Sequence, residues 1–281
     1  MPRVNTDLTS DMRHFIGPLG PLDPAAYAYV LNLCPSDLAW EFLRRNRNYQ
    51  RDYLLGRRGA DPVRLLACGR YLTRLRRVAP RSDRWDLYVL VDPKAPAPLA
   101  PLCWRIGTAA PILDGVAERA APEAASALSI SRCAAAGHII VAPSGEEYII
   151  FRDAERAATL RLEGDRASLG PVHVTFLIRN LPDPQRLADR FRTLTQLISS
   201  PRPQARPSRL RLFLRDALFA LDARHAGMSQ REIASVLYGV EATRSGWSSS
   251  KGSIRERIRH LLGRGQQLRD GGYRRLLAEG G

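Results

Sequence analysis

Residues 227–239 read GMSQREIASVLYG, and this stretch decides how the C-terminal part of the chain folds. Ser229 and Glu232 have the spacing of a capping box, in which the serine hydroxyl accepts from the glutamate N–H and the glutamate carboxylate accepts from the serine N–H. Gly227 can end a preceding helix. The stretch predicts a short capped helix, which is either the first half of a DNA-reading helix-turn-helix or an ordinary surface helix.

The flanking residues favour the first interpretation. One helix is predicted over about 209–225, the capped helix over 230–238, and a third over about 253–269, with a loop through Trp247 before it. The third helix has an apolar stripe, and its arginines lie elsewhere on the cylinder, as in a recognition helix. Small polar residues and free backbone amides at its start can meet phosphates and base edges. The candidate DNA contacts are Lys251, Ser253, Arg255, Arg257, Arg259 and Arg264.

Two features leave other interpretations open. The loop between the second and third helices has about fourteen residues, far more than the three or four of a simple helix-turn-helix. A basic helix that is merely solvated in a bundle shows the same pattern of charges. The three helices could therefore also form a protein-interaction module whose basic face meets an acidic protein surface.

Positive charge is concentrated in the same region. The chain has 43 Lys and Arg against 28 Asp and Glu, a formal net charge of +15. Residues 201–281 contain 16 Lys and Arg and 7 Asp and Glu, so +9 of this charge lies in less than a third of the chain. Arginine suits bidentate contacts with phosphate and guanine, although a GC-rich coding sequence would also favour it over lysine. The net charge favours a polyanionic partner such as nucleic acid, and its concentration here is typical of a nucleic-acid-binding module.

The central part of the chain changes to the two-residue period of strands. The runs HIIVA, EYIIFR, ATLRLEG and VHVTFLIRN alternate with turn-like segments from Gly137 to Asn180. Asp183 and Pro184 then start a helix with apolar residues at intervals of three and four. We expect an antiparallel β-meander of about four strands with one packed helix.

The N-terminal part is predicted to be helical. Asp23 and Pro24 begin one helix, Pro35 ends it, and Ser36 begins another. The second helix contains RRNRN among aromatic residues and has the pattern of a basic amphipathic helix. Its aromatic residues are expected in the core, with the Arg and Asn face either solvated or available to DNA.

These elements predict an α+β chain in four parts. An N-terminal helical domain (1–100) precedes a linker or poorly assigned segment (101–136), an antiparallel sheet with a helix (137–200) and a helix-turn-helix-like three-helix unit (201–281). The proline-dense stretches DPKAPAPLAP and SPRPQARPS mark the boundaries, because proline at this density interrupts helix and central strand alike.

Nothing in the sequence forms a catalytic or metal-binding pattern. The five histidines show no HxxxH or HExxH spacing, the four cysteines lie about thirty residues or more apart, and no P-loop, GxGxxG or GxSxG occurs. No stretch has the pattern of a signal peptide or a membrane span. We therefore expect a cytoplasmic protein with reduced cysteines that is not an enzyme and uses no metal or cofactor.

On these motifs the chain resembles a proteobacterial family of helix-turn-helix-variant regulators of integrative and conjugative elements, the FseA type. The family pattern of SQREIAxVLxG, a loop with one Trp, a helix with paired arginines and a terminal GGYRxLL is matched at 229–239, 247, 253–264 and 271–277. The sheet from about residue 137 is similar to the N-terminal half of that family. DPAAYAYV and WEFLRRNRNYQRDY resemble its companion regulator domain.

The resemblance implies a transcriptional activator of genes for excision and conjugative transfer of a mobile element. Its implied partners are double-stranded DNA and either RNA polymerase or an antiactivator protein. Short members with only the second part resemble antiactivators, so a module that binds another regulator without reading DNA is the alternative.

Overall fold

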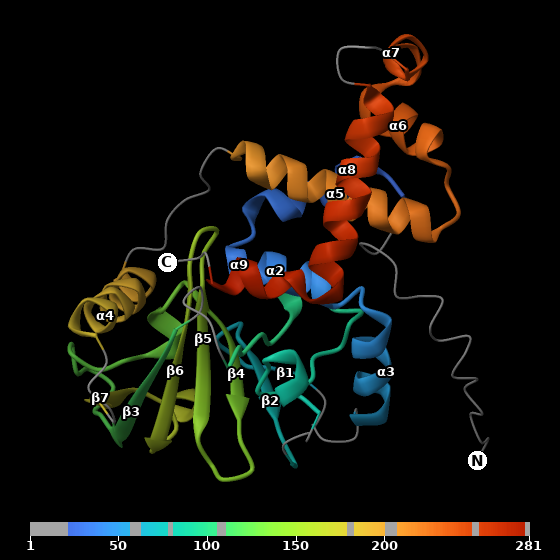
Figure 1. The fold of residues 1–281 in the computed structure, drawn as a ribbon. Coiled ribbons are helices and arrows are strands. Elements are labelled where there is room, and N and C mark those ends of the chain that lie inside the picture. The colour runs from blue at the N-terminus through green and yellow to red at the C-terminus, as the bar shows by residue number, and fades with distance from the viewer. Residues whose placement is uncertain are drawn as a thin grey trace.

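The computed structural model describes residues 22–56, 63–77, 81–105, 111–178, 183–199, 207–248 and 253–278. Figure 1 shows three layers: a sheet with one flanking helix, a middle layer in which N-terminal helices lie beside the last helix, and the remaining C-terminal helices above them. The α+β class predicted from the sequence is confirmed. The structure differs from the prediction in three strands outside the predicted meander, in one additional C-terminal helix, in a break within the second N-terminal helix, and in the burial of part of the RRNRN segment.

The sheet has seven strands in the order β1-β2-β4-β5-β6-β3-β7. Neighbours β4, β5 and β6 are antiparallel, as predicted for the meander. Strand β2 pairs with β4 in parallel, and β3 pairs with β6 in parallel, so the sheet is mixed. The strands are β1 Arg64–Leu65, β2 Tyr71–Arg74, β3 Ile112–Arg119, β4 Ala136–Val141, β5 Glu147–Arg152, β6 Ala157–Gly164 and β7 Val172–Leu177.

Strand β3 corrects the predicted sheet, because it comes from segment 101–136, which we expected to be a linker. It lies between β6 and β7, so β7 pairs with β3 and does not extend the meander. The inward-facing residues of β3 include Gly115 and Ala117, which are too small to give a strong strand signal in the sequence. The fold requires the glycine, since an added Cβ would lie 2.9 Å from a methyl group of Val174 on β7.

The two faces of the sheet contribute to different hydrophobic cores. Helix α4, Pro184–Ser199, covers one face with Leu194 and Leu197, so the predicted helix after residue 183 is present. The other face contributes Ile140 and Ile150 to a core shared with the N-terminal and C-terminal helices. The sheet is thereby joined to the helical layers.

The N-terminal helices are η2 Pro24–Asn32, α2 Pro35–Leu43 and α3 Arg47–Gly56. The single helix predicted after Pro35 is therefore two helices. The break lies at Asn46, whose side-chain oxygen accepts from the N–H groups of Asn48 and Tyr49 and so caps α3. The RRNRN segment is also not the solvated face we expected, because Arg44, Arg45 and Asn46 are buried.

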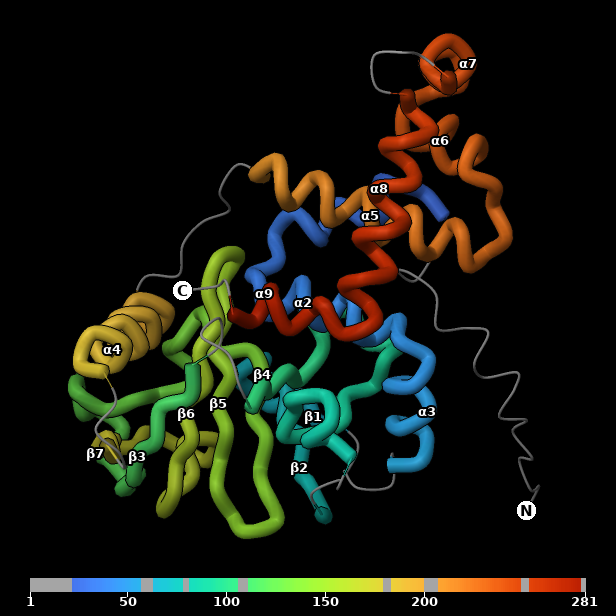
Figure 2. The backbone as a smooth tube through the Cα atoms, viewed as in Figure 1, coloured from blue at the N-terminus to red at the C-terminus, as the bar shows by residue number. Residues whose placement is uncertain are grey.

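The C-terminal elements are α5 Arg209–His225, α6 Gln230–Tyr238, α7 Val240–Gly246, α8 Ile254–Gln267, η8 Leu268–Gly272 and α9 Tyr273–Ala278. The expected polar loop after Gly239 contains α7, which buries Thr243. Gly239 makes the turn between α6 and α7 with a φ of 90°. Figure 2 traces α8 from α7 across α5 to α9, which lies beside α2.

Candidate nucleic-acid interface

The capping box of the GMSQREIASVLYG stretch has both of its hydrogen bonds. The Ser229 hydroxyl accepts from the N–H of Glu232 at 3.2 Å, and the Glu232 carboxylate accepts from the N–H of Ser229 at 2.6 Å. These bonds to Ser229 hold the pKa of the Glu232 carboxyl below its usual range. Ile233 and Ala234 are fully buried, so α6 acts as a scaffold that packs against α5 and α8.

Helix α8 buries one stripe and exposes the rest. Ile258, Leu261 and Leu262 are buried toward α5 and α6. At about 3.6 residues per turn, Arg255 and Arg259 fall on one flank of the exposed surface. Arg257 and Arg264 fall on the opposite flank, and the outermost line between the pairs carries Glu256, His260, Gly263 and Gln267. The His260 ring packs beside Phe213 of α5, with ring centroids 5.2 Å apart.

The four arginines therefore do not share one face, but form two pairs on either side of the helix. A helix with side chains is about 10–12 Å across and the major groove about 12 Å wide, so flanking arginines can reach the phosphates of both strands. Such contacts position a protein on DNA, whereas residues on the outer line can reach base edges.

The charges of these arginines are largely available to a partner. Within the described residues, Arg255 and Arg257 form no ion pair, and both are exposed. Arg259 lies 3.9 Å from Glu256, a weak contact between exposed side chains. Arg264 donates to the side-chain oxygen of Gln267, a neutral group.

The start of α8 differs in part from the expected arrangement of DNA contacts. Ser253 is the N-cap of α8, and its hydroxyl accepts from the N–H of Glu256 at 3.2 Å. The Ser253 hydroxyl oxygen thus already accepts a hydrogen bond within α8, and its O–H remains as a donor. Lys251, another expected contact, lies outside the described residues.

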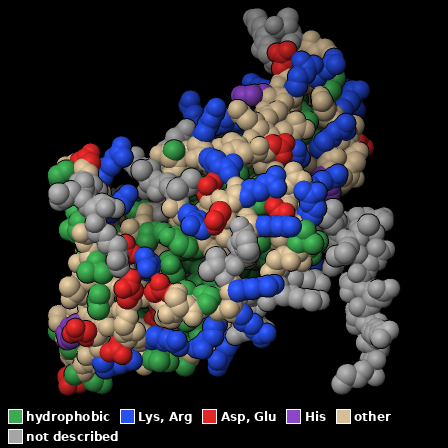
Figure 3. All heavy atoms as spheres, turned by 60° about the horizontal axis from the view of Figure 1, so that its bottom comes forward, with side chains coloured by type: hydrophobic (Ala, Val, Ile, Leu, Met, Phe, Trp, Pro, Cys, Tyr) green, Lys and Arg blue, Asp and Glu red, His purple; other side chains and the backbone are tan. Residues whose placement is uncertain are grey.

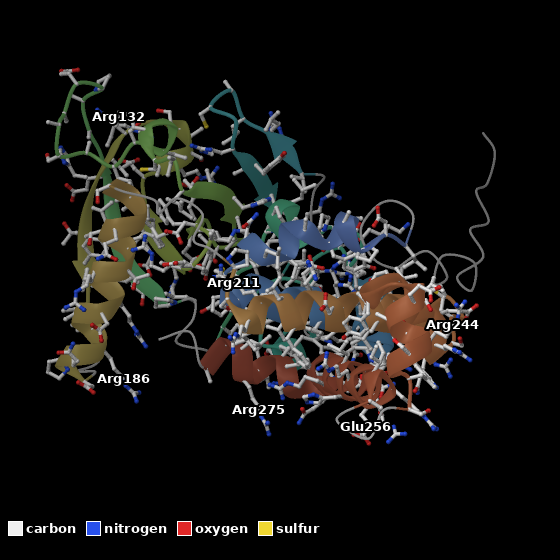
Figure 4. All side chains as sticks on the ribbon, turned by 90° about the horizontal axis from the view of Figure 1, so that it is seen from above. Arg132, Arg186, Arg211, Arg244, Glu256 and Arg275 are labelled. Carbon is white, nitrogen blue, oxygen red and sulfur yellow. The ribbon has the colours of Figure 1, made fainter. Side chains whose placement is uncertain are left out.

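The neighbouring helices carry two further exposed arginines, which the sequence pattern alone did not point to. Arg231 lies on α6, and Arg244 lies on α7, where it pairs with Glu241 at 3.0 Å. Figure 4 shows Arg244 at the far end of the C-terminal helices from Arg275. Figure 3 shows Lys and Arg side chains over much of these helices. Their excess over acidic residues was visible in the sequence, but the helix α7 that presents Arg244 was not.

A buried polar cluster joins the N-terminal helices to α5. Arg45 donates to both carboxylate oxygens of Asp222, at 2.8 and 2.7 Å, and the Tyr27 hydroxyl donates to the same carboxylate at 2.7 Å. Glu41 accepts from Arg45 at 2.9 Å and from Arg44 at 2.7 Å. These side chains are almost completely excluded from solvent. Arg44 and Arg45 of RRNRN thus hold the helical layers together and are buried away from DNA, whereas Arg47 of the same segment is exposed.

Titration within this cluster follows from burial and pairing. Burial opposes ionisation of Glu41, but the Arg44 and Arg45 guanidinium groups outweigh it and lower the pKa of the carboxyl to about 2. Burial, supported by the Asp222 carboxylate, raises the pKa of Tyr27 far above its usual value. Glu41 therefore stays ionised and Tyr27 neutral throughout the physiological pH range.

The remaining chemistry-bearing residues of the described segments lie apart. No group of three or more His, Cys, Asp or Glu side chains among them could hold a metal ion, and their cysteines are free thiols. His138 is buried, its pKa is lowered to about 3 by burial and by the neighbouring Arg152, and its ring bonds to the carbonyl of Leu99. Across the same segments, no helix is long and apolar enough to cross a membrane.

Two family models match parts of the chain. Residues 177–278 match the family described as a T6SS transcription factor DNA-binding domain. Residues 22–68 match the proteobacterial transcriptional regulator-like domain. No curated protein matches the chain. The first match contains all the C-terminal helices and the second contains the RRNRN segment, so together they support a DNA-binding transcription regulator with DNA as its partner.

Proposed function

We propose that the protein is a sequence-specific transcriptional regulator that places α8 in the major groove. The observation that carries this proposal is the pair of arginines on each flank of α8, with a polar line between them and a buried stripe behind. Arg255, Arg257, Arg259 and Arg264 would contact the backbone of both strands, and Lys251 and Ser253 would approach it from the start of the helix.

The resemblance to regulators of integrative and conjugative elements favours an activator of excision and transfer genes. On that proposal, RNA polymerase or an antiactivator protein would contact parts of the molecule away from α8. A transcription assay with purified polymerase on the upstream promoter tests it, because an activator raises the yield of transcript and a repressor lowers it.

The DNA-reading role is tested by measuring binding to the DNA upstream of the gene and to a scrambled duplex at two salt concentrations. We expect the wild type to prefer the upstream DNA by several kcal/mol. The double substitution Arg255→Ala and Arg259→Ala should weaken binding and lower the slope of log affinity against log salt by about 1.8, since each phosphate contact contributes about 0.9.

A matched control removes the same charge elsewhere. Arg186 and Arg192 on α4 are exposed, at 73% and 58%, and lie on the helix that flanks the sheet. Their double alanine variant should keep the wild-type salt slope. If the two double variants had equal slopes of log affinity against log salt, α8 would not be part of the DNA interface. Equal binding of upstream and scrambled DNA by the wild type would instead favour the protein-interaction alternative.

A further inference from the structure

We propose that DNA lies lengthwise along α8, with its closest approach at Gly263, and continues over α9 to Arg275. This inference rests on the proposed function and specifies how the same site binds its ligand. The alternative geometry is end-on, with only the first turn of α8 in the groove. The two geometries differ at residues far from the start of the helix.

Gly263 is the first observation that favours the lengthwise geometry. It is exposed in the interior of α8, where glycine lowers helix stability relative to alanine. The fold does not require it, because an added Cβ would meet no atom within 4 Å among those described. Gly265, two residues later, differs: its Cβ would lie 2.8 Å from Leu221 of α5. A glycine in the middle of an exposed helical surface suits close approach of a ligand to the backbone.

The position of Gly263 on the helix identifies that ligand. It lies on the outermost line with Glu256 and Gln267, between the two flanks that carry the arginine pairs. If the flanking arginines contact phosphates of both strands, this line faces the floor of the groove. A residue without a side chain there allows the helix to enter more deeply.

The motif GGYRRLL gives a second, independent observation. Gly271 has a φ of 126°, and a Cβ on Gly272 would lie 2.7 Å from the carbonyl oxygen of Gln267, so both glycines serve the turn into α9. Tyr273 is fully buried against Trp104 at a ring distance of 6.0 Å. These residues of the motif are therefore explained by the fold.

The two arginines of the motif differ from each other. Arg274 donates to Asp86 at 2.6 Å and to the carbonyl of Arg84 at 2.8 Å, which ties α9 to the segment before residue 105. Arg275 is exposed and forms no ion pair or hydrogen bond with a described residue. Figure 4 shows Arg275 on α9 and Glu256 on α8 pointing out of the same side of the molecule. Arg275 thus lies on the same side of the molecule as the outer line of α8, on the helix that turns away from its end (Figure 1 and Figure 4).

The segment to which Arg274 is tied also carries exposed arginines. Arg84 is 58% exposed and Arg81 is 53% exposed, and both pair with the single carboxylate of Asp52, at 3.4 and 3.5 Å. Helix α8 spans about 21 Å at about 1.5 Å per residue, which corresponds to about six base pairs. A duplex that follows α8 therefore reaches α9 within one helical turn.

The first experiment compares Gly263→Ala with the wild type in urea unfolding and in binding to the upstream DNA. We expect the variant to be more stable and to bind about tenfold more weakly, a loss comparable with one mismatched base pair. Thr195→Ala on α4, an exposed site where alanine also favours the helix, is the control and should leave binding unchanged. Unchanged affinity in Gly263→Ala, or a fall in its stability, would overturn the inference.

The second experiment tests the extension onto α9. Arg275→Ala should lower the salt slope by about 0.9 on a duplex of about 24 base pairs, and should leave binding to a central duplex of about 10 base pairs unchanged. Arg186→Ala is the control of equal charge. An unchanged slope on the long duplex would show that DNA does not reach α9. A wild type without sequence preference would be a failure of the proposed function, which is a separate result.

Discussion

Glu41 shows how single residues set the pH range in which this protein is stable. Its folded pKa of about 2 lies below its ordinary value of 4.5, so its ionisation stabilises the folded state at pH values above 4.5. This contribution is lost as the pH falls from 4.5 toward 2. We expect the free energy of unfolding, measured in urea, to fall between about pH 5 and about pH 3. In Glu41→Gln this fall should be smaller, and an equal fall in both proteins would contradict the assignment.

Asp222 is the residue whose loss should be most damaging to the fold. Asp222→Ala would leave the Arg45 guanidinium buried with one of its two carboxylate partners removed. We expect a loss of about 3–5 kcal/mol in the free energy of unfolding. Asp216→Ala is a suitable control, because within the described segments the ion pair of Asp216 is with the adjacent, partly exposed Arg215, and its loss should cost less than about 1 kcal/mol. Similar losses of unfolding free energy in Asp222→Ala and Asp216→Ala would show that the buried pair stabilises the fold no more than the partly exposed one.

At the scale of elements, the capping box makes a prediction about α6. Ser229→Ala removes the acceptor for the N–H of Glu232 and should lower the free energy of unfolding by about 1 kcal/mol. Ser235→Ala, in the same helix, removes only a bond to the preceding turn and should have little effect. Chemical unfolding of both variants measures the difference. Weaker DNA binding by Ser229→Ala at unchanged stability would mean that this serine acts on DNA and not as a cap.

The elements that sequence reasoning located well have strong signals at both ends. Helices α5 and α6 begin and end where their caps and glycines predicted. Helix α7 was missed because its seven residues are too short for a periodic pattern. Strand β3 was missed because small residues fill its inward positions. The break between α2 and α3 was missed because the two helices together continue one amphipathic pattern, and only the cap by Asn46 separates them.

The candidate site was only partly predictable for a related reason. The arginines of α8 were identified from their spacing, but no local pattern separates the arginines of RRNRN from them. Both segments are basic and lie on amphipathic helices. What distinguishes them is the presence of Asp222 on α5, 177 residues from Arg45, and contacts at that separation leave no local pattern.

At the scale of the whole molecule, the C-terminal helices depend on the N-terminal ones. Phe219 of α5 packs against Tyr27, and Tyr273 of α9 is buried in the core that contains α2. We expect residues 207–281 alone to lack a stable tertiary structure, although the sequence pattern predicts a separate unit over 201–281. Amide dispersion in NMR spectra of this fragment and of residues 22–281 tests the prediction. A dispersed spectrum from the fragment would show that the DNA-binding helices fold on their own.

The long separation between bonded residues also bears on how the protein is made. Asn46 donates to the carbonyl of Arg269, 223 positions later, and Tyr27 donates to Asp222, 195 positions later. During translation, the N-terminal helices leave the ribosome before the residues that pair with their polar and charged groups have been synthesised. Domains whose contacts are so distant fold late and expose apolar surface meanwhile, which makes nascent chains clients of chaperones. Helix α8 packs on α5 and continues into α9, so the surface proposed to bind DNA forms only after nearly every described residue has been translated. Incomplete chains are therefore expected not to bind promoter DNA.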